Sequence, residues 1–160
     1  MILEIGCGER RDFPDSLGLD IRKTTKVDVI GDARSLPFKD ESFDHVFSSH
    51  TLEHLPHGDC DRVLREWIRV LRPGGVIELR MPDLRARALI FALNPTIRSM
   101  RMIYGEQDYE ENYHKSGYSY GLLKGMLRAV GVVKVKRVIS GYRGIPFLPS
   151  CLHVRGFKRG

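Results

Sequence analysis

The chain has 160 residues, of which 42% are hydrophobic and 29% charged, with a formal net charge of +6 at neutral pH. A chain of this length can form one hydrophobic core, so we expect a single domain over residues 1–160. The chain begins on an apolar run and has no stretch of about 18 consecutive apolar residues, which argues against a secretory leader and a membrane span. Its three cysteines lie far apart with no Cys-x-x-Cys pair, which excludes a disulfide framework and a zinc knuckle and favours a cytoplasmic location.

Short apolar runs rich in Val and Ile, bounded by Gly, Pro or Asp, predict strands along the chain. The predicted strands cover residues 2–5, 17–21, 27–30, 44–48, 76–81, 132–139 and 152–157. Between the fourth and fifth strands, a helix is predicted over residues 59–71 because Val63, Leu64 and Trp67 share one face. A second helix is predicted over 121–130, ending before Gly131. Strands connected by helices indicate an α/β sheet, mostly parallel.

The stretch 84–120 is less regular than the rest. It reads as partly helical up to residue 103 and is polar and aromatic beyond that point. Because it follows the carboxyl end of a predicted strand, we expect it to bind or cover a substrate.

The first predicted strand ends in Gly6-Cys7-Gly8, and Asp20 ends the second. Glycines in this spacing let the backbone pass close beneath a ligand. A dinucleotide site would need a third glycine, where this chain has Arg11, and a helix that residues 9–16, which include Pro14, are too short to form. A pyrophosphate site is therefore excluded, whereas Asp20 is placed to accept hydrogen bonds from two ribose hydroxyls. S-adenosylmethionine is a ligand with a ribose and no pyrophosphate.

Four segments in succession resemble the signatures of class I S-adenosylmethionine-dependent methyltransferases. They are LEIGCG, GLDI, GDARSLPFKDESFDHVFSSHTLEHL and VLRPGGVIELRMPD, and they cover most of residues 1–83. A later segment, YGEQDYEENYHKSGYSYGLLKGMLRAVGV, resembles the C-terminal half of small members that bacteria often encode beside sugar and cell-surface polysaccharide genes. The chain thus resembles a small methyltransferase-11-like member of this family.

This resemblance implies an α/β, Rossmann-like, seven-stranded sheet in the order 3-2-1-4-5-7-6. The last strand would be antiparallel, helices would lie on both faces, and the fold would be reduced at the N-terminus. The cofactor, S-adenosyl-L-methionine, would cross the carboxyl ends of the first four strands. The residues implied in binding it are Gly6, Gly8, Asp20, Ile21, Asp32, Ala33, Ser49 and His50.

The resemblance also implies a part for each of these positions. Gly6 and Gly8 would line the methionine and ribose parts of the cofactor, with Asp20 on the ribose. Asp32 and Ala33 would meet the adenine edge through a carboxylate and a backbone amide, although Asp32 also fits a plain turn aspartate. Ser49 and His50 would approach the sulfonium from the side where the acceptor enters.

Two departures from the family pattern affect the cofactor site. The usual third glycine is replaced near Arg10, where a short irregular loop stands in for a helix. The chain also starts directly on the first predicted strand, so we expect the N-terminal helix that commonly covers the cofactor to be absent.

Catalytic residues leave little trace in such a sequence, because methyl transfer from a sulfonium needs mainly alignment in a dry pocket. If the acceptor is a hydroxyl or a neutral amine, a base helps, and His50 and His114 are the candidate catalytic residues. Tyr104, Tyr113 and Tyr118 lie near His114 in the sequence. For each histidine, a structural hydrogen bond is the alternative interpretation.

The segment from His50 to His54 also matches the inverted zinc-protease signature HxxEH. That motif needs a sustained helix and a further ligand, whereas Pro56 ends the segment after about one turn. We therefore predict no metal, and we interpret Glu53 and His54 as a charged helix start.

The acceptor is predicted to be a small molecule, sugar or glycan, on the resemblance alone. An RNA acceptor is the alternative, because arginines and lysines around residues 80–87 and 134–137 suit an anionic partner. The segment Asn94-Pro95-Thr96 lacks the second proline and the aromatic with which amino-methylating nucleic-acid enzymes stack a flipped base. A non-catalytic partner that keeps the fold, or a homodimer in which a neighbour covers the cofactor, also remains open.

Overall fold

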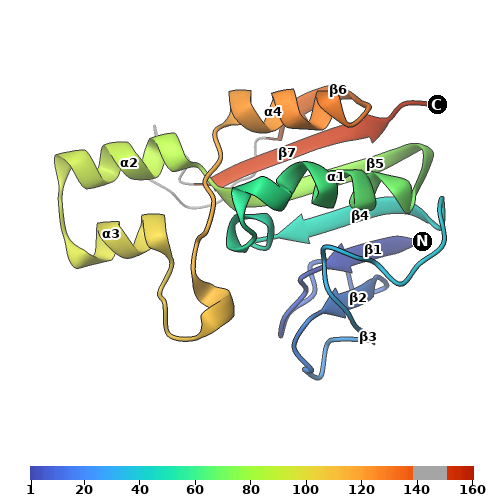
Figure 1. Ribbon diagram of the computed structural model, residues 1–160, viewed down its shortest axis with the longest axis horizontal. Helices are drawn as coiled ribbons and strands as arrows, with labels where there is room; N and C mark the ends of the chain where they lie inside the picture. Colours follow the sequence, from blue (N-terminus) through green and yellow to red (C-terminus); the bar gives the residue numbers. More distant parts are fainter. Residues whose placement is uncertain (139–150) are drawn as a thin grey trace.

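The computed structural model describes residues 1–138 and 151–160, which form one seven-stranded sheet (Figure 1). The strands are β1 (Ile2–Ile5), β2 (Leu17–Asp20), β3 (Val29–Ile30), β4 (Phe43–Ser49), β5 (Leu71–Pro82), β6 (Val132–Arg137) and β7 (Cys151–Lys158). Their order is β3-β2-β1-β4-β5-β7-β6, and β7 runs antiparallel to both of its neighbours. The predicted strand order and the antiparallel last strand are confirmed. The end of the predicted strand 132–139 lies outside the described residues.

Within the described residues, four α-helices and three 3₁₀ turns connect the strands. The helices are α1 (Cys60–Arg69), α2 (Leu84–Leu93), α3 (Ile97–Tyr104) and α4 (Tyr120–Ala129), and the turns are η1 (Leu52–His54), η2 (His57–Asp59) and η3 (Glu110–Asn112). Helix α1 ends two residues before the predicted boundary because Leu71 already pairs with Phe43 in the sheet. Strand β5 thus begins earlier than predicted, and it includes the turn at Gly74, whose φ is +74°.

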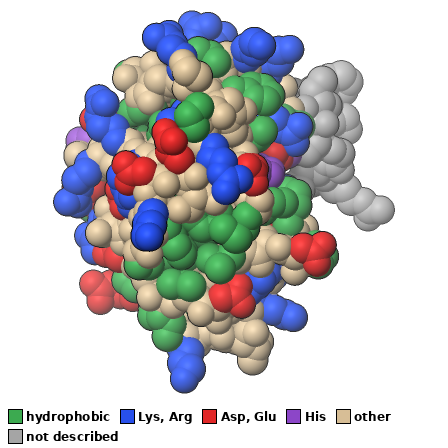
Figure 2. Space-filling view, turned by 90° about the vertical axis from the view of Figure 1, so that its right-hand side faces the viewer, with side chains coloured by type: hydrophobic (Ala, Val, Ile, Leu, Met, Phe, Trp, Pro, Cys, Tyr) green, Lys and Arg blue, Asp and Glu red, His purple; other side chains and the backbone are tan. Residues whose placement is uncertain are grey.

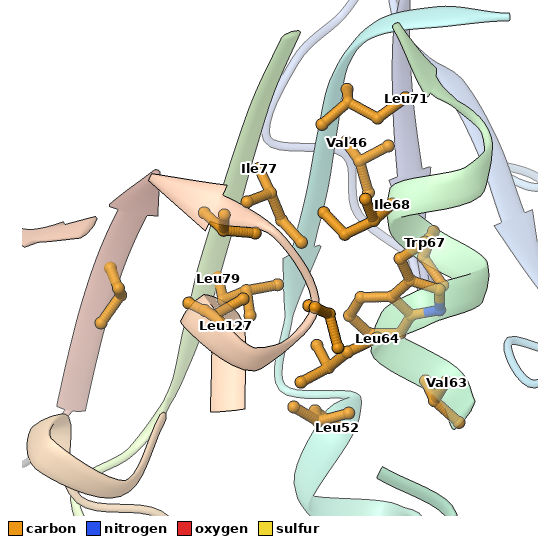
Figure 3. Packing of buried hydrophobic residues seen from close by; sticks show 14 of the residues in the cluster. Val46, Leu52, Val63, Leu64, Trp67, Ile68, Leu71, Ile77, Leu79 and Leu127 are labelled. Atoms are coloured by element: carbon orange, nitrogen blue, oxygen red, sulfur yellow. The ribbon is translucent and has the colours of Figure 1, made fainter. Parts of the chain in front are cut away.

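The main core lies between the sheet and the helices α1 and α4, which share one face (Figures 1 and 3). Leu64 and Trp67 of α1 are fully buried and point towards Ile77 and Leu79 of β5, and Leu127 of α4 packs beside them. These side chains come from the apolar face that predicted the first helix. The sheet is thus anchored by its central strands.

The opposite face of β1 and β4 is covered by an irregular loop, residues 6–16, rather than by a helix. The Phe13 ring of this loop lies edge-on to Phe47 and His45 of β4, with ring centres 5.2 and 5.3 Å away. The prediction that residues 9–16 are too short for a regular helix is therefore confirmed.

Helices α2 and α3 project away from the sheet beyond the carboxyl end of β5 (Figure 1). The segment Asn94-Pro95-Thr96 starts α3, because Thr96 and Ser99 cap that helix reciprocally. The polar residues of this segment therefore serve to cap a helix.

Charged side chains are spread over the surface. On the face shown in Figure 2, lysines and arginines are interspersed with acidic residues rather than gathered into one patch. Within the described residues, no helix combines the length and the apolar character needed to cross a bilayer.

Candidate functional site

A pocket of about 370 Å³ opens at the carboxyl ends of the first strands. It is lined by Gly6, Gly8, Leu19, Asp20, Ile21, Arg22, Gly31, Asp32, Ala33, Arg34, His50, Thr51, His54, Leu55, Pro56, Tyr109, Glu110, Glu111 and Lys115. Of the eight residues predicted to bind a cofactor, it brings together all but Ser49. The site therefore gathers residues from five separate stretches of the chain.

The glycine turn after β1 forms the floor of this pocket. Gly6 has φ +72° and lies so close to Thr51 that an added Cβ would stand 2.0 Å from the Thr51 Oγ1. Gly8 has φ +55°, and its N–H donates a 2.8 Å hydrogen bond to Asp20 Oδ2. Both positions need glycine because the positive φ and, at Gly6, the close packing disfavour any side chain.

Asp20 connects the glycine turn to the next strand. Its side chain is 7% exposed, and its second oxygen, Oδ1, accepts a 2.9 Å hydrogen bond from the Arg22 N–H. Because each oxygen of an ionised carboxylate accepts about two hydrogen bonds, both retain capacity for ligand hydroxyls. The carboxylate is thus fixed in place at the edge of the pocket.

Two charged residues that the sequence analysis did not assign hold the glycine loop without a helix. Glu4, which is buried, accepts hydrogen bonds from the N–H groups of Asp12 and Phe13 at 3.0 and 2.7 Å. Arg11, which stands where a dinucleotide fold has glycine, donates from Nε to the Lys26 carbonyl at 2.9 Å and also pairs with Asp28. These contacts replace the hydrogen bonds that a helix would supply.

The far end of the pocket is formed by the turn after β3. Arg34 pairs with both carboxylate oxygens of Asp32, and this hydrogen-bonded contact lowers the Asp32 pKa. The Ala33 carbonyl accepts a 2.8 Å hydrogen bond from the indole N–H of Trp67. The core helix α1 therefore positions this turn, a link that the sequence pattern did not reveal.

One part of the 84–120 excursion lies at the pocket. Tyr109, Glu110, Glu111 and Lys115 line it, and the Arg22 guanidinium lies 4.9 Å from the centre of the Tyr109 ring. Helices α2 and α3 do not reach it. Of the excursion, only the segment 109–115 lies at this pocket, and a covering role for it stays a prediction.

Ser49 lines a second, adjoining pocket of about 230 Å³. This second pocket shares Gly6 and His50 with the first and includes Arg10 and Arg80. The Arg80 Nε is buried and has no hydrogen-bond partner within the described part of the chain. The two pockets therefore adjoin at Gly6 and His50.

His50 lies where the two pockets meet. Its backbone has φ +55°, and its Nδ1 lies 2.9 Å from Glu53 Oε1. Hydrogen bonds to Cys151 and Glu53 raise its pKa to about 9, so the imidazole is protonated at neutral pH. As a base, His50 would first have to lose this proton. Its ring is already hydrogen-bonded to Glu53 and Cys151.

His114 lies outside both pockets. Its Nδ1 is 2.9 Å from the Ile103 carbonyl, and burial lowers its pKa, so the ring is neutral at neutral pH. Of the nearby tyrosines, Tyr118 is buried with its hydroxyl 2.6 Å from Cys60 Sγ, whereas Tyr104 and Tyr113 are exposed. The structure thus gives His114 the structural hydrogen bond that we kept as the alternative to catalysis.

Known proteins resemble this chain in both sequence and structure. The family model described as "Methyltransferase domain" matches residues 3–79. Methyltransferase GfsG of Streptomyces halstedii is 39% identical over 80 residues, which are 50% of this chain and 26% of that protein. Demethylmenaquinone methyltransferase of Listeria monocytogenes is 33% identical over 105 residues, covering 59% of this chain and 43% of that protein. The chain therefore matches less than half the length of these relatives.

Two solved structures share the fold over 99% of this chain. One is a S-adenosylmethionine-dependent methyltransferase from Thermotoga maritima, with a TM-score of 0.67, 20% identity and 82% of that chain covered. The other is 1,6-didemethyltoxoflavin-N1-methyltransferase of Burkholderia thailandensis with bound 1,6-didemethyltoxoflavin and S-adenosylhomocysteine, with a TM-score of 0.68, 14% identity and 71% covered. The sequence matches show a methyltransferase domain over residues 3–79, and the solved structures show that the chain has the fold of class I S-adenosylmethionine-dependent methyltransferases.

Proposed function

We propose that this protein transfers a methyl group from S-adenosylmethionine to a small-molecule or sugar acceptor. The observation that carries the proposal is the Asp20 carboxylate, fixed by Gly8 and Arg22 at the edge of a pocket whose floor is glycine. A fixed anion with spare acceptor capacity suits the paired hydroxyls of a ribose. The free thiols of all three cysteines fit the reducing cytoplasm, where we place the protein.

The proposed pose of the cofactor extends through the two adjoining pockets. Adenine would lie against Asp32 and Ala33, with the ribose on Asp20. The methionine part would turn past Gly6 into the second pocket, where the unpartnered Arg80 Nε suits its carboxylate. In this pose the sulfonium lies near His50 and Ser49, where the two pockets join.

The residues of the chain mainly align and enclose the reactants. S-adenosylmethionine supplies an electrophilic methyl group, and its sulfur keeps the bonding electron pair. The glycine turn and Asp20 fix the donor, while residues 109–115 cover the pocket, which favours the in-line arrangement and excludes water. The His50 ring already bonds to Glu53 and Cys151, so its catalytic role stays a prediction that would need one of these hydrogen bonds to break and the proton to be lost. A base role for His114 stays a prediction that its position outside the pockets does not favour.

The chemistry of the cover favours a small acceptor over a nucleic acid. Glu110 and Glu111 stand at the pocket, and two carboxylates there repel a polyanion. Two of the similar proteins, by their names, act on demethylmenaquinone and on 1,6-didemethyltoxoflavin, both small molecules. RNA is the second choice, and retention on RNA with a steep salt dependence would favour it.

Calorimetry with S-adenosylhomocysteine tests the cofactor site. We expect the unchanged protein to bind it and Asp20→Asn to bind it roughly 30-fold more weakly, because a hydrogen bond to a charged group contributes about 2 kcal/mol. Asp61→Asn is the matched control, since the Asp61 side chain is 61% exposed on α1. Equal affinity for all three proteins, with folding checked by circular dichroism, would refute the site.

A screen of methyl transfer from labelled S-adenosylmethionine to pooled metabolites, glycans and RNA then tests the acceptor. Transfer to a small molecule is the expected result. Binding of S-adenosylhomocysteine without transfer to any pool would instead favour a non-catalytic partner.

A further inference from the structure

Three potential metal ligands meet beside the cofactor pocket, from two segments about 60 residues apart in the chain. Glu53 and His54 belong to η1, and His114 lies between η3 and α4. One ligand atom from each residue lies within 4.8 Å of the ligand atoms of the other two, and the rings of His54 and His114 are 5.1 Å apart edge to face. His54 also lines the cofactor pocket.

Backbone hydrogen bonds hold these two segments together. The N–H groups of Lys115 and Ser116 both donate to the Glu53 carbonyl, at 2.8 and 3.0 Å. The His114 N–H donates to the Tyr104 carbonyl at 2.9 Å. The three side chains therefore project from a framework that is already fixed by the main chain.

Both histidines present the tautomer that metal ligands use. The Nδ1 of His54 lies 3.1 Å from the Tyr113 carbonyl, and the Nδ1 of His114 lies 2.9 Å from the Ile103 carbonyl. A carbonyl can only accept, so each Nδ1 carries the proton and each Nε2 keeps a lone pair. Metal-bound histidines almost always donate their other ring N–H in this way.

The carboxylate supplies a second, independent observation. The Glu53 side chain is only 1% exposed, and its Oε1 bonds to His50. Its Oε2 is buried with no hydrogen-bond partner in the described residues. A buried carboxylate oxygen without a partner destabilises the folded chain, and a bound cation would remove that cost.

We propose that Glu53, His54 and His114 bind one divalent transition-metal ion, for which Zn²⁺ is the best match. Two imidazoles and one carboxylate form a recognised zinc ligand set that leaves a fourth position open. Donor atoms around Zn²⁺ lie roughly 3.4 Å apart, so a side-chain adjustment of about 1 Å closes the site. This proposal does not depend on the methyl-transfer proposal.

This ligand set differs from the HxxEH pattern in the sequence. In that motif, His50 and His54 would bind the metal from one helix, whereas η1 is a single turn and His50 bonds to the Glu53 carboxylate instead. The third ligand comes from the excursion. Metal binding would therefore fasten residues 113–116 to η1 and, with them, the adjoining segment that covers the cofactor pocket.

Titration of the metal-free full chain with Zn²⁺, followed by calorimetry, tests the proposal. We expect one Zn²⁺ per chain, no competition from excess Mg²⁺, and a visible spectrum of four- or five-coordinate Co²⁺ when cobalt replaces zinc. His54→Ala and His114→Ala should each weaken Zn²⁺ binding by roughly 100-fold or more, since even an outer partner of a metal ligand is worth 10- to 100-fold.

Three variants separate this site from other binding sites. His57→Ala, an exposed histidine of η2, and Cys151→Ser should keep the full affinity. Glu53→Gln should lose it, and if that variant does not fold, His54→Gln and His114→Gln carry the test. Saturable binding that survives both histidine substitutions, or no stoichiometric binding by the unchanged chain, would overturn the proposal. Methyl transfer is not read out here, so its failure and that of the metal site are distinguishable.

Discussion

Two regions of the sheet, the N-terminal strands and the strands covered by helices, are stabilised by different interactions. The N-terminal region, residues 1–42 with β1 to β3, has no helix between its strands and is fixed by hydrogen bonds of charged residues, above all the buried Glu4 and the partly buried Arg11. The helix-covered region, with β4, β5, β7, α1 and α4, is fixed by apolar packing around Trp67 and Leu127 (Figure 3). The proposed cofactor site lies mainly in the first region. Apolar packing therefore supports the fold, and directed polar contacts shape the site.

The largest effect is expected from a substitution in the apolar core of the helix-covered region. Leu127 is 1% exposed in α4, and Leu127→Ala should lower the free energy of unfolding by about 3 kcal/mol, because it leaves a cavity. Affinity for S-adenosylhomocysteine should not change. Urea denaturation measures the first effect and calorimetry the second. Leu122→Ala in the same helix is the control, since Leu122 is 53% exposed. A similar loss in both variants would contradict the packing argument.

A smaller loss of stability, but a loss of binding as well, is expected in the N-terminal region. Arg11→Met removes the contacts to the Lys26 carbonyl and Asp28, at a cost of about 2 kcal/mol. Because these contacts shape the glycine loop, S-adenosylhomocysteine should also bind more weakly. The same two measurements apply, with Arg62→Met, a 67% exposed arginine, as the control. Unchanged binding in Arg11→Met would show that the loop holds its shape without this side chain.

The hydrogen bond from Trp67 to Ala33 connects the two regions, so its removal should affect both stability and binding. Trp67→Phe keeps an aromatic ring in the core but removes the N–H that bonds to the Ala33 carbonyl. We expect a loss of about 1 kcal/mol in stability, as for one neutral hydrogen bond, together with a measurable loss of affinity for S-adenosylhomocysteine. Adenosine alone should show the same loss of affinity if Ala33 meets the adenine. A loss confined to stability would separate Trp67 from the site.

The sequence predicted the parts of the fold that depend on local pattern. Val and Ile runs located all seven strands, and the glycine spacing with Asp20 located the pocket, because each of these signals lies within a few consecutive residues. The sequence could not pair residues that lie far apart. The hydrogen bond from Trp67 to Ala33 and the approach of His114 to Glu53 depend on the folded chain, and nothing in the local pattern of either segment indicates them.

The sequence did not reveal how deeply two charged side chains are buried. Glu53 was interpreted as part of a charged helix start, and it does lie in the first turn of η1, but its side chain is buried. Arg11 was noted only as a missing glycine, although its guanidinium is 16% exposed and organises the loop. Charge in a sequence usually indicates a solvated surface, so a charged side chain that is largely buried is visible only in three dimensions.

The last prediction concerns a buried charged residue in the helix-covered region and tests whether that region is stabilised by apolar packing alone. Its effect at neutral pH is expected to be the smallest. On the sheet face opposite α1, Glu78 of β5 is buried beside His153 and Arg155 of β7. Burial alone would raise the Glu78 pKa, but hydrogen bonds from His153 and Arg155, with His45 3.5 Å away, outweigh it and lower the pKa well below the ordinary value of 4.5.

A folded-state pKa below the unfolded value means that Glu78 contributes stability above about pH 4.5, which is lost as the pH falls below that value. Between pH 7 and about pH 5.5 the group is ionised in both states, so this contribution should be constant. Below that range, the unchanged protein should lose stability more steeply with falling pH than Glu78→Gln does, as measured by urea denaturation at each pH. Glu106→Gln, whose side chain is 61% exposed, should follow the unchanged protein. Parallel curves for the unchanged protein and Glu78→Gln would mean that this polar group adds no pH-dependent stability, and that the helix-covered region depends on apolar packing alone.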